Sequence, residues 1–236
     1  MVIQEDIVFS WSGGKDSAFS LYEVKRAGAY CVRRLFTTLT EGYDRISMHG
    51  VRRALLEEQA RFLGLPLDTL YIPKNGTNQD YESRLADLLE KYKQTGIHSV
   101  GFGDLFLEDI RAYREKNLAS IGMRAVFPVW KKDTAALARD FISDGFKAII
   151  VCVDPKTLDP SFTGRLFDAD FLRDLPPSVD PCGENGEFHS FVFDGPIFSE
   201  AVRFAVGEIV SRDGFYFCDL LPIKLETPSP SNRLKS

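Results

Sequence analysis

The chain has 236 residues, of which 44% are hydrophobic and 27% are charged, and its formal net charge is −5. This composition is typical of globular proteins and is sufficient for one large domain, or for one domain with a smaller second one. No apolar run approaches the roughly 18–20 residues of a membrane span, and the acidic charge balance argues against nucleic acid as a partner.

The first two thirds of the chain alternate between strand-like and helix-like segments. Apolar runs typical of strands occupy residues 7–11, 31–39, 67–73, 98–104, 124–130 and 146–154. Segments with apolar residues at helical spacing occupy residues 15–28, 49–64, 79–96, 105–122 and 133–145. A glycine ends each helical segment, at Gly28, Gly64, Gly96, Gly122 and Gly145. This order predicts an α/β fold in which helices cover both faces of a parallel sheet.

The pattern changes after residue 154, where proline, glycine and aspartate become more frequent. A short helix is predicted over 168–174, a strand over 188–194, and antiparallel strands on either side of a turn at 212–214. We therefore expect a smaller C-terminal α+β part. The predicted organisation is an α/β domain over 1–135, a substrate domain over 136–223 and a disordered tail over 224–236.

The string SGGKDS, at residues 12–17, lies between the first strand and the first helix. Glycines let a backbone approach an anion closely, and a helix N-terminus adds N–H donors and the positive end of the helix dipole. Ser12 and Ser17 add hydroxyl groups, Lys15 adds a positive charge, and Asp16 suits the first turn of a helix. The spacing matches neither GxxxxGK[ST] nor GxGxxG, so the alternatives are another type of phosphate loop and a plain glycine turn.

SGGKDS resembles the PP-loop signature of the ATP pyrophosphatase superfamily. The resemblance implies an ATP-binding domain of the adenine nucleotide α-hydrolase (HUP) type, with a five-stranded parallel sheet. It also implies cleavage of ATP between the α- and β-phosphates, with adenylation of a substrate oxygen and release of pyrophosphate. The residues that would hold this pyrophosphate are Ser12, Gly13, Gly14, Lys15, Asp16 and Ser17.

Further strings are similar to the diphthine–ammonia ligase family of that superfamily. CGENGEFHSFVFDGPIF (182–198) is similar to its GExGE[FY]xTF segment. GFGDLFLEDIRAYRE (101–115) and GMRAVFPVW (122–130) lie where the family has a glycine-rich strand end, an arginine-bearing helix and a P-x-W strand. The helix departs from the family's usual S-x-YQ-x-x-R. The resemblance, which covers about residues 5–200, therefore implies an ATP-dependent amide-forming ligase without identifying its acid.

With the resemblance, acidic and basic residues outside the glycine turn become candidates for catalysis. Glu184 and Glu187 flank an Asn-Gly turn and could act as a general base, bind Mg²⁺ or hold an ammonium group. Arg111 is predicted to pair with a substrate carboxylate or with the α-phosphate. The alternatives are an acidic surface loop for the two glutamates and a helix-surface position for the arginine. Lys15 and Asp16 complete the predicted catalytic set.

The remaining predicted contacts of the nucleotide come from strand ends. Asp104 ends a strand, where open α/β sheets bind ligands, although a helix N-cap is an equal alternative. The other predicted contacts are Ser10, Thr37, Met48 and Gly103, with Thr37 and Met48 assigned to adenine. The predicted Mg²⁺ ligands are Asp16 and Glu187. His189 is a proton-shuttle candidate with an equal structural alternative, and Cys182 is predicted to be a buried small residue.

The implied cofactors are ATP and Mg²⁺, with a small-molecule or protein-borne carboxylate as substrate and ammonia or an amine as nitrogen donor. Two other functions stay open: a non-catalytic adenine-nucleotide sensor, and a tRNA-modifying PP-loop enzyme, which the charge and the isolated cysteines disfavour. The N-terminal residues lack a signal-peptide pattern, and the four cysteines form no CxxC pair. A cytoplasmic location with reduced thiols is therefore expected. The oligomeric state is open, a homodimer being one alternative.

Overall fold

A computed structural model describes residues 4–46 and 49–223; the predicted adenine contact Met48 and the predicted tail over 224–236 lie outside this range. The elements are β1 (Glu5–Ser10), α1 (Lys15–Ala27), β2 (Tyr30–Thr40), α2 (Arg53–Leu63), β3 (Leu67–Ile72), α3 (Asn78–Gln94), β4 (Ser99–Gly101), α4 (Glu108–Ser120), β5 (Arg124–Val126), α5 (Thr134–Ser143), β6 (Lys147–Val153), the 3₁₀ turn η1 (Pro160–Phe162), α6 (Ala169–Asp174), β7 (Phe188–Asp194), β8 (Phe204–Arg212) and β9 (Phe215–Pro222).

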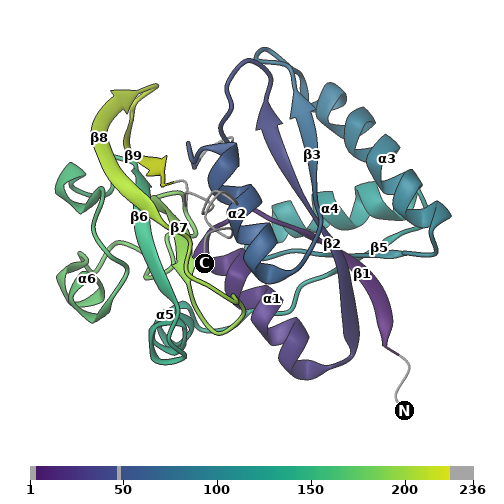
Figure 1. The fold of residues 1–236 in the computed structure, drawn as a ribbon, viewed down its shortest axis with the longest axis horizontal. Helices are drawn as coiled ribbons and strands as arrows, with labels where there is room; N and C mark the ends of the chain where they lie inside the picture. Colours follow the sequence, from purple (N-terminus) through teal and green to yellow (C-terminus); the bar gives the residue numbers. More distant parts are fainter. Residues whose placement is uncertain (1–3, 47–48, 224–236) are drawn as a thin grey trace, which may run out of the picture.

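The N-terminal part is a five-stranded parallel sheet in the order β3-β2-β1-β4-β5. Successive side chains of a strand point to opposite faces of the sheet, and β1 places apolar side chains on both faces. Ile7 and Phe9 pack with apolar residues of α1 and α2, whereas Val8 packs with those of α3 and α4. The predicted α/β sheet with helices on both faces is therefore confirmed (Figure 1).

The order of the strands places a crevice beside β1. From β1, which lies between β2 and β4, the chain continues to β2 and β3 on one side before it crosses to β4 and β5 on the other. All five strands are parallel, so their C-terminal ends meet at one edge of the sheet. Ligands of open α/β sheets bind at this edge, where the connections diverge.

A second, antiparallel sheet has the order β7-β6-β9-β8. The last strand of the sequence series, predicted over 146–154, belongs here, because β6 pairs in antiparallel fashion with β7 and β9. The continuous apolar run of β6 is typical of a parallel core strand. In this antiparallel strand the run has another cause: both faces of β6 are covered by other elements. Ile149 and Val151 share a core with residues of α2, and Ile150 shares one with residues of α5 and α6.

Helices α1 and α2 lie between the two sheets (Figure 1). Leu56 and Ala60 of α2 share a core with the parallel sheet, and Leu55 and Phe62 share one with the antiparallel sheet. All four cysteines are unpaired, and Cys182 is buried as predicted. Within the described part of the chain, no helix combines the length and the apolar composition needed to cross a membrane.

Candidate functional site

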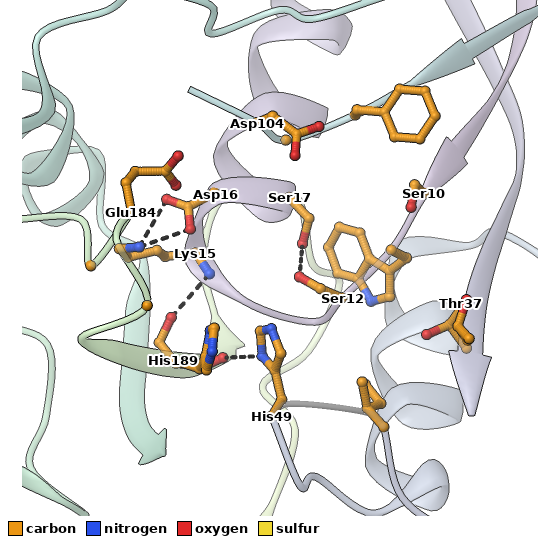
Figure 2. A pocket seen from close by; sticks show the side chains of 18 of the residues that line it. Ser10, Ser12, Lys15, Asp16, Ser17, Thr37, His49, Asp104, Glu184 and His189 are labelled. Carbon is orange, nitrogen blue, oxygen red and sulfur yellow. Dashed lines mark hydrogen bonds and ion pairs between the residues drawn. The ribbon is translucent and has the colours of Figure 1, made fainter. Parts of the chain in front are cut away.

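A cavity of about 470 Å³ opens at the C-terminal ends of β1, β2 and β4, and the segment leading into β7 closes one side of it. Nine of the residues predicted for the site lie on its wall: Ser10, Ser12, Lys15, Asp16, Ser17, Thr37, Gly103, Asp104 and Glu184. Figure 2 shows the side chains of all of these except Gly103, at and around the turn between β1 and α1. The cavity therefore brings together residues that are distant in the sequence, from Ser10 at the end of β1 to Ser190 in β7.

The SGGKDS turn adopts a backbone that only glycine accommodates easily. Gly13 has a φ of 76°, and a Cβ atom at this position would lie 2.8 Å from Oε1 of Gln59. The hydroxyl groups of Ser12 and Ser17 lie 3.1 Å apart, and the Ser17 hydroxyl donates to the Gly14 carbonyl at 3.0 Å. The turn therefore presents two hydroxyls and the N-terminus of a 13-residue helix to the cavity, an arrangement suited to anions.

Gln59 of α2 fixes this turn from behind. Its fully buried amide accepts a hydrogen bond from the Trp11 indole at 2.8 Å, and it donates to the carbonyls of Gly13 at 3.0 Å and Val192 at 2.6 Å. The backbone N–H of Val192 also donates to the Gly13 carbonyl. One side chain thus joins the residue after β1, the turn and β7. Sequence patterns did not indicate this role, since a glutamine in a helix is usually exposed.

Lys15 is bound to protein groups instead of extending freely into the cavity. Its ammonium contacts both Asp16 oxygens, at 2.9 and 2.8 Å, and the Cys182 carbonyl, and it lies 5.4 Å from the centre of the Phe188 ring. Burial alone would lower the pKa of Lys15, but the acidic groups around it, Asp16 first among them, together outweigh burial and the pKa is raised. Lys15 therefore has a structural role at the junction with the C-terminal part, in addition to its predicted role toward phosphate.

Glu184 and Asp104 bring two further carboxylates to the same cavity. Burial, reinforced by the charge of Asp16, raises the pKa of Glu184 to about 8. Asp104 instead forms an ion pair with Arg114, whose Nε lies 2.7 Å from Asp104 Oδ2. The Arg114 guanidinium also lies over the Phe102 ring, 4.3 Å from its centre. Glu184 is the carboxylate of this wall whose charge is least compensated by protein groups.

Two predicted catalytic residues, Glu187 and Arg111, do not line the cavity. The Glu187 carboxylate accepts hydrogen bonds from the backbone of Asp180 at 3.1 Å and from the Asn185 backbone and side chain, both at 2.9 Å. These hydrogen bonds shape the 180–187 loop. Arg111 bonds to Glu115 at 2.7 Å and stacks over Trp130, and Arg114, one turn later, reaches the cavity instead.

Thr37 lies at the end of the cavity bounded by β2. Its side chain is buried, and its Oγ1 has no hydrogen-bond partner among the described residues. An unsatisfied buried hydroxyl beside a cavity is suited to a polar ligand atom. This supports the prediction of Thr37 as an adenine contact.

The sequence interpretation left out several residues of the wall. His49 and Ser190 were not predicted to line the site, although His49 begins the helix-like segment 49–64 and Ser190 lies in the glutamate-bearing string 182–198. Ser190 Oγ accepts the backbone N–H of Lys15 at 3.1 Å, and its carbonyl lies 3.2 Å from His49 Nδ1. The alternation of β7 is the signal that would have found Ser190, because it lies two residues after Phe188.

Comparisons with known proteins agree over most of the chain. The family model of the diphthamide synthase N-terminal domain matches residues 6–125, and that of the diphthamide synthase C-terminal domain matches residues 133–220. The diphthine–ammonia ligase of Danio rerio is 29% identical over 230 residues, covering 86% of this chain and 89% of the relative. The protein of the same name from Bos taurus is 26% identical, with 94% of each chain covered. The Homo sapiens protein is 25% identical, with 86% and 85% covered.

Proposed function

The chain belongs to the diphthamide synthase family, and from this premise we propose that it is an ATP-dependent ligase that adenylates a carboxylate, releases pyrophosphate and transfers the acyl group to ammonia or an amine. The family membership confirms the resemblance found in the SGGKDS and CGENGEF strings. The observation that carries the proposal is the glycine turn at the N-terminus of α1, which faces a cavity that also holds the Glu184 carboxyl.

The first half-reaction would take place along the turn. Adenine would lie toward Thr37 and the terminal phosphates against Ser12, Ser17 and the N-terminus of α1. A carboxylate oxygen of the substrate attacks the α-phosphorus, and the bond to the bridging oxygen of the β-phosphate breaks. The departing pyrophosphate takes up the negative charge, which the helix N-terminus stabilises.

The second half-reaction would use the acidic side of the cavity. The nitrogen nucleophile attacks the acyl carbon, AMP leaves with the electrons of the acyl–oxygen bond, and the nitrogen loses a proton. Glu184 is suited to accept that proton, because its pKa of about 8 lies close to the pH at which such a base works best. Arg114 is proposed in place of Arg111 as the contact of a substrate carboxylate.

The wall also fits a divalent cation bound together with phosphates. Mg²⁺ is usually held by one or two carboxylates and by substrate phosphates instead of a complete protein cage. Asp16 and Glu184 provide such carboxylates. The negative charge of Asp16 contributes to the raised pKa of Glu184, and a bound cation would relieve this repulsion between the two carboxylates. When bound, Mg²⁺ would neutralise phosphate charge during adenylation.

A pyrophosphate-release assay tests the proposal. The protein is incubated with ATP, Mg²⁺, ammonium and a panel of acids that includes a diphthine-bearing protein, and the nucleotide products are separated. We expect AMP and pyrophosphate in equal amounts, dependent on one of the acids. Formation of ADP and phosphate would contradict the proposal, and tight ATP binding without turnover on any acid would favour the sensor function.

A further inference from the structure

Two of the three histidines of the chain meet on the wall of the cavity. The rings of His49, which precedes α2, and His189, in β7, are stacked with their centres 4.6 Å apart and their planes at 28°. His49 Nδ1 lies 3.2 Å from the Ser190 carbonyl oxygen. A carbonyl only accepts, so Nδ1 carries the proton and donates it, and this bond fixes the His49 ring against that of His189.

His189 has a polar atom that the described residues leave unsatisfied. Its Nε2 is buried and has no hydrogen-bond partner among residues 4–46 and 49–223. Leaving a buried polar group without a partner costs about 1–3 kcal/mol, so such atoms are rare in folded proteins. On a cavity wall, the expected partner is a ligand.

The neighbours of the pair indicate the chemistry of that ligand. His49 lies so close to the glycine turn that a Cβ atom on Gly14 would be 2.9 Å from its Cε1. Ser190, next to His189, accepts the backbone N–H of Lys15 at the start of α1. In Figure 2 the pair lies below the turn, on the side away from Asp104 and Glu184. The histidine side of the cavity is therefore its least acidic side, next to the predicted phosphate position.

The charge state of the rings is compatible with a donor role. Burial lowers the pKa of His49 to about 4 and places that of His189 well below its ordinary value, so both rings are neutral near pH 7. The other titratable groups on the wall are Lys15, Asp16, Tyr81, Asp104, Arg114 and Glu184. A neutral imidazole has one N–H, and in His189 the atom that lacks a partner is Nε2.

We propose that His189 donates a hydrogen bond from Nε2 to a terminal phosphate oxygen of the bound nucleotide, and that His49 is the positioning residue that holds the His189 ring in place. This inference rests on the proposed nucleotide site and adds a contact from the C-terminal part. It makes the antiparallel sheet a part of the phosphate site instead of a separate substrate domain. A phosphate bound at the SGGKDS turn would then also connect β7 to the turn that follows β1.

Isothermal titration of ATP, pyrophosphate and AMP tests the contact. His189→Phe keeps a ring for stacking and removes the donor, His189→Gln keeps a donor, and His98→Phe changes the exposed third histidine. We expect His189→Phe to weaken ATP and pyrophosphate binding about tenfold or more and AMP binding less than about twofold. His189→Gln should recover most of the affinity, and His98→Phe should have no effect.

The outcomes separate this inference from the proposed function. Unchanged ATP and pyrophosphate affinity in His189→Phe, or an equal loss for AMP, would overturn the contact while leaving the nucleotide site intact. Absence of ATP binding by the unmodified protein would overturn both. Imidazole ¹⁵N spectra of the unmodified protein give an answer that does not depend on the folding of a variant: ATP should shift the His189 Nε2 resonance and leave that of His98 unchanged.

Discussion

Lys15 and Glu184 show how differently the protein treats two charges in one cavity. Lys15 is held by Asp16 and by a backbone carbonyl, so its charge is compensated before any ligand binds. Among the residues that the structure describes, the Glu184 carboxylate accepts only one long hydrogen bond, at 3.4 Å from the backbone N–H of Leu105, while Asp16 repels its ionised form. The unfavourable burial of Glu184 is therefore a cost to the fold that a bound cation or ammonium group would remove.

The raised pKa of Glu184 predicts how stability depends on pH. Below its ordinary value of 4.5 the carboxyl is protonated in both the folded and the unfolded chain. Between pH 4.5 and about 8 the unfolded chain has lost a proton that the folded protein retains, so the free energy of unfolding falls as pH rises. In Glu184→Gln this loss is absent, and we expect the variant to gain stability relative to the unmodified protein across that interval. Urea unfolding without metal, at several pH values, measures the difference.

Glu187→Gln is the matched control for this measurement, with the opposite sign. Burial opposes ionisation of Glu187, but the hydrogen bonds from Asn185 and Asp180 outweigh it and lower the pKa. Its stabilising effect is present above the ordinary pKa and is lost as pH falls. The Glu187→Gln variant should therefore be less stable near neutral pH. If the free energy of unfolding of Glu184→Gln differed from that of the unmodified protein by the same amount from pH 4.5 to about 8, the raised pKa of Glu184 would be ruled out.

At the scale of elements, α2 connects the two sheets and the glycine turn. Its apolar residues contribute to two cores, and its single buried amide, Gln59, contacts backbone on both sides. Helical periodicity predicted that α2 exists and that one side of it is apolar. It did not predict the second apolar contact, because that contact depends on where the antiparallel sheet packs.

Gln59→Leu tests the connection that α2 makes. Leucine fills a similar volume but leaves the Trp11 N–H and the Val192 carbonyl without their partner, while the Gly13 carbonyl keeps the Val192 N–H. With about 1–3 kcal/mol for each buried group left unpaired, we expect the free energy of unfolding to fall by about 3 kcal/mol. ATP binding should weaken as well, because the turn loses its support. Urea unfolding and titration calorimetry measure the two effects.

Gln94→Leu provides the comparison, since Gln94 is exposed at the end of α3. A surface change of this kind is expected to alter stability by less than about 0.5 kcal/mol. If both variants lost the same small amount of stability, Gln59 would not be the support of the turn. If Gln59→Leu lost stability but bound ATP normally, the turn would be held by its backbone contacts alone.

At the scale of the whole molecule, the parallel sheet could be predicted and the arrangement of the second sheet could not. Local signals were enough for the alternating strands and helices, and all five glycines after the helices have left-handed φ values. The SGGKDS string identified the wall next to β1. His49 and Arg114 reach the cavity only because segments distant in sequence pack together, so no local pattern could select them. Glu187 does not line the cavity, and spacing alone could not show this, because it does not tell whether a loop carboxylate faces the cavity or its own backbone.

Ion pairs also join the antiparallel sheet to the segment between β2 and α2, and they should make this contact sensitive to acid. Asp219 of β9 accepts Arg45 at 2.8 Å and Arg52 at 2.7 Å, both from the segment between β2 and α2 that also carries His49. The hydrogen bond from Arg52, opposed by burial and reinforced by Arg45, lowers the pKa of Asp219 to about 2. Because the folded value is depressed, this stabilisation is complete above the ordinary value of 3.8 and is lost as pH falls toward 2.

Asp219→Asn should therefore reduce the free energy of unfolding near neutral pH, by about 1 kcal/mol because the side chains are partly exposed and solvent screens the pairs. The difference from the unmodified protein should be constant above about pH 4 and should shrink at lower pH, as followed by urea unfolding. Asp213→Asn is the control, since Asp213 is an exposed turn residue whose nearest cation, Arg212, is 3.7 Å away. A difference for Asp219→Asn that persisted unchanged at low pH would show that shape, and not charge, holds β9 against the β2–α2 segment. Because His49 lies in that segment, weaker ATP binding in the same variant would show that the contact between the sheets also supports the cavity.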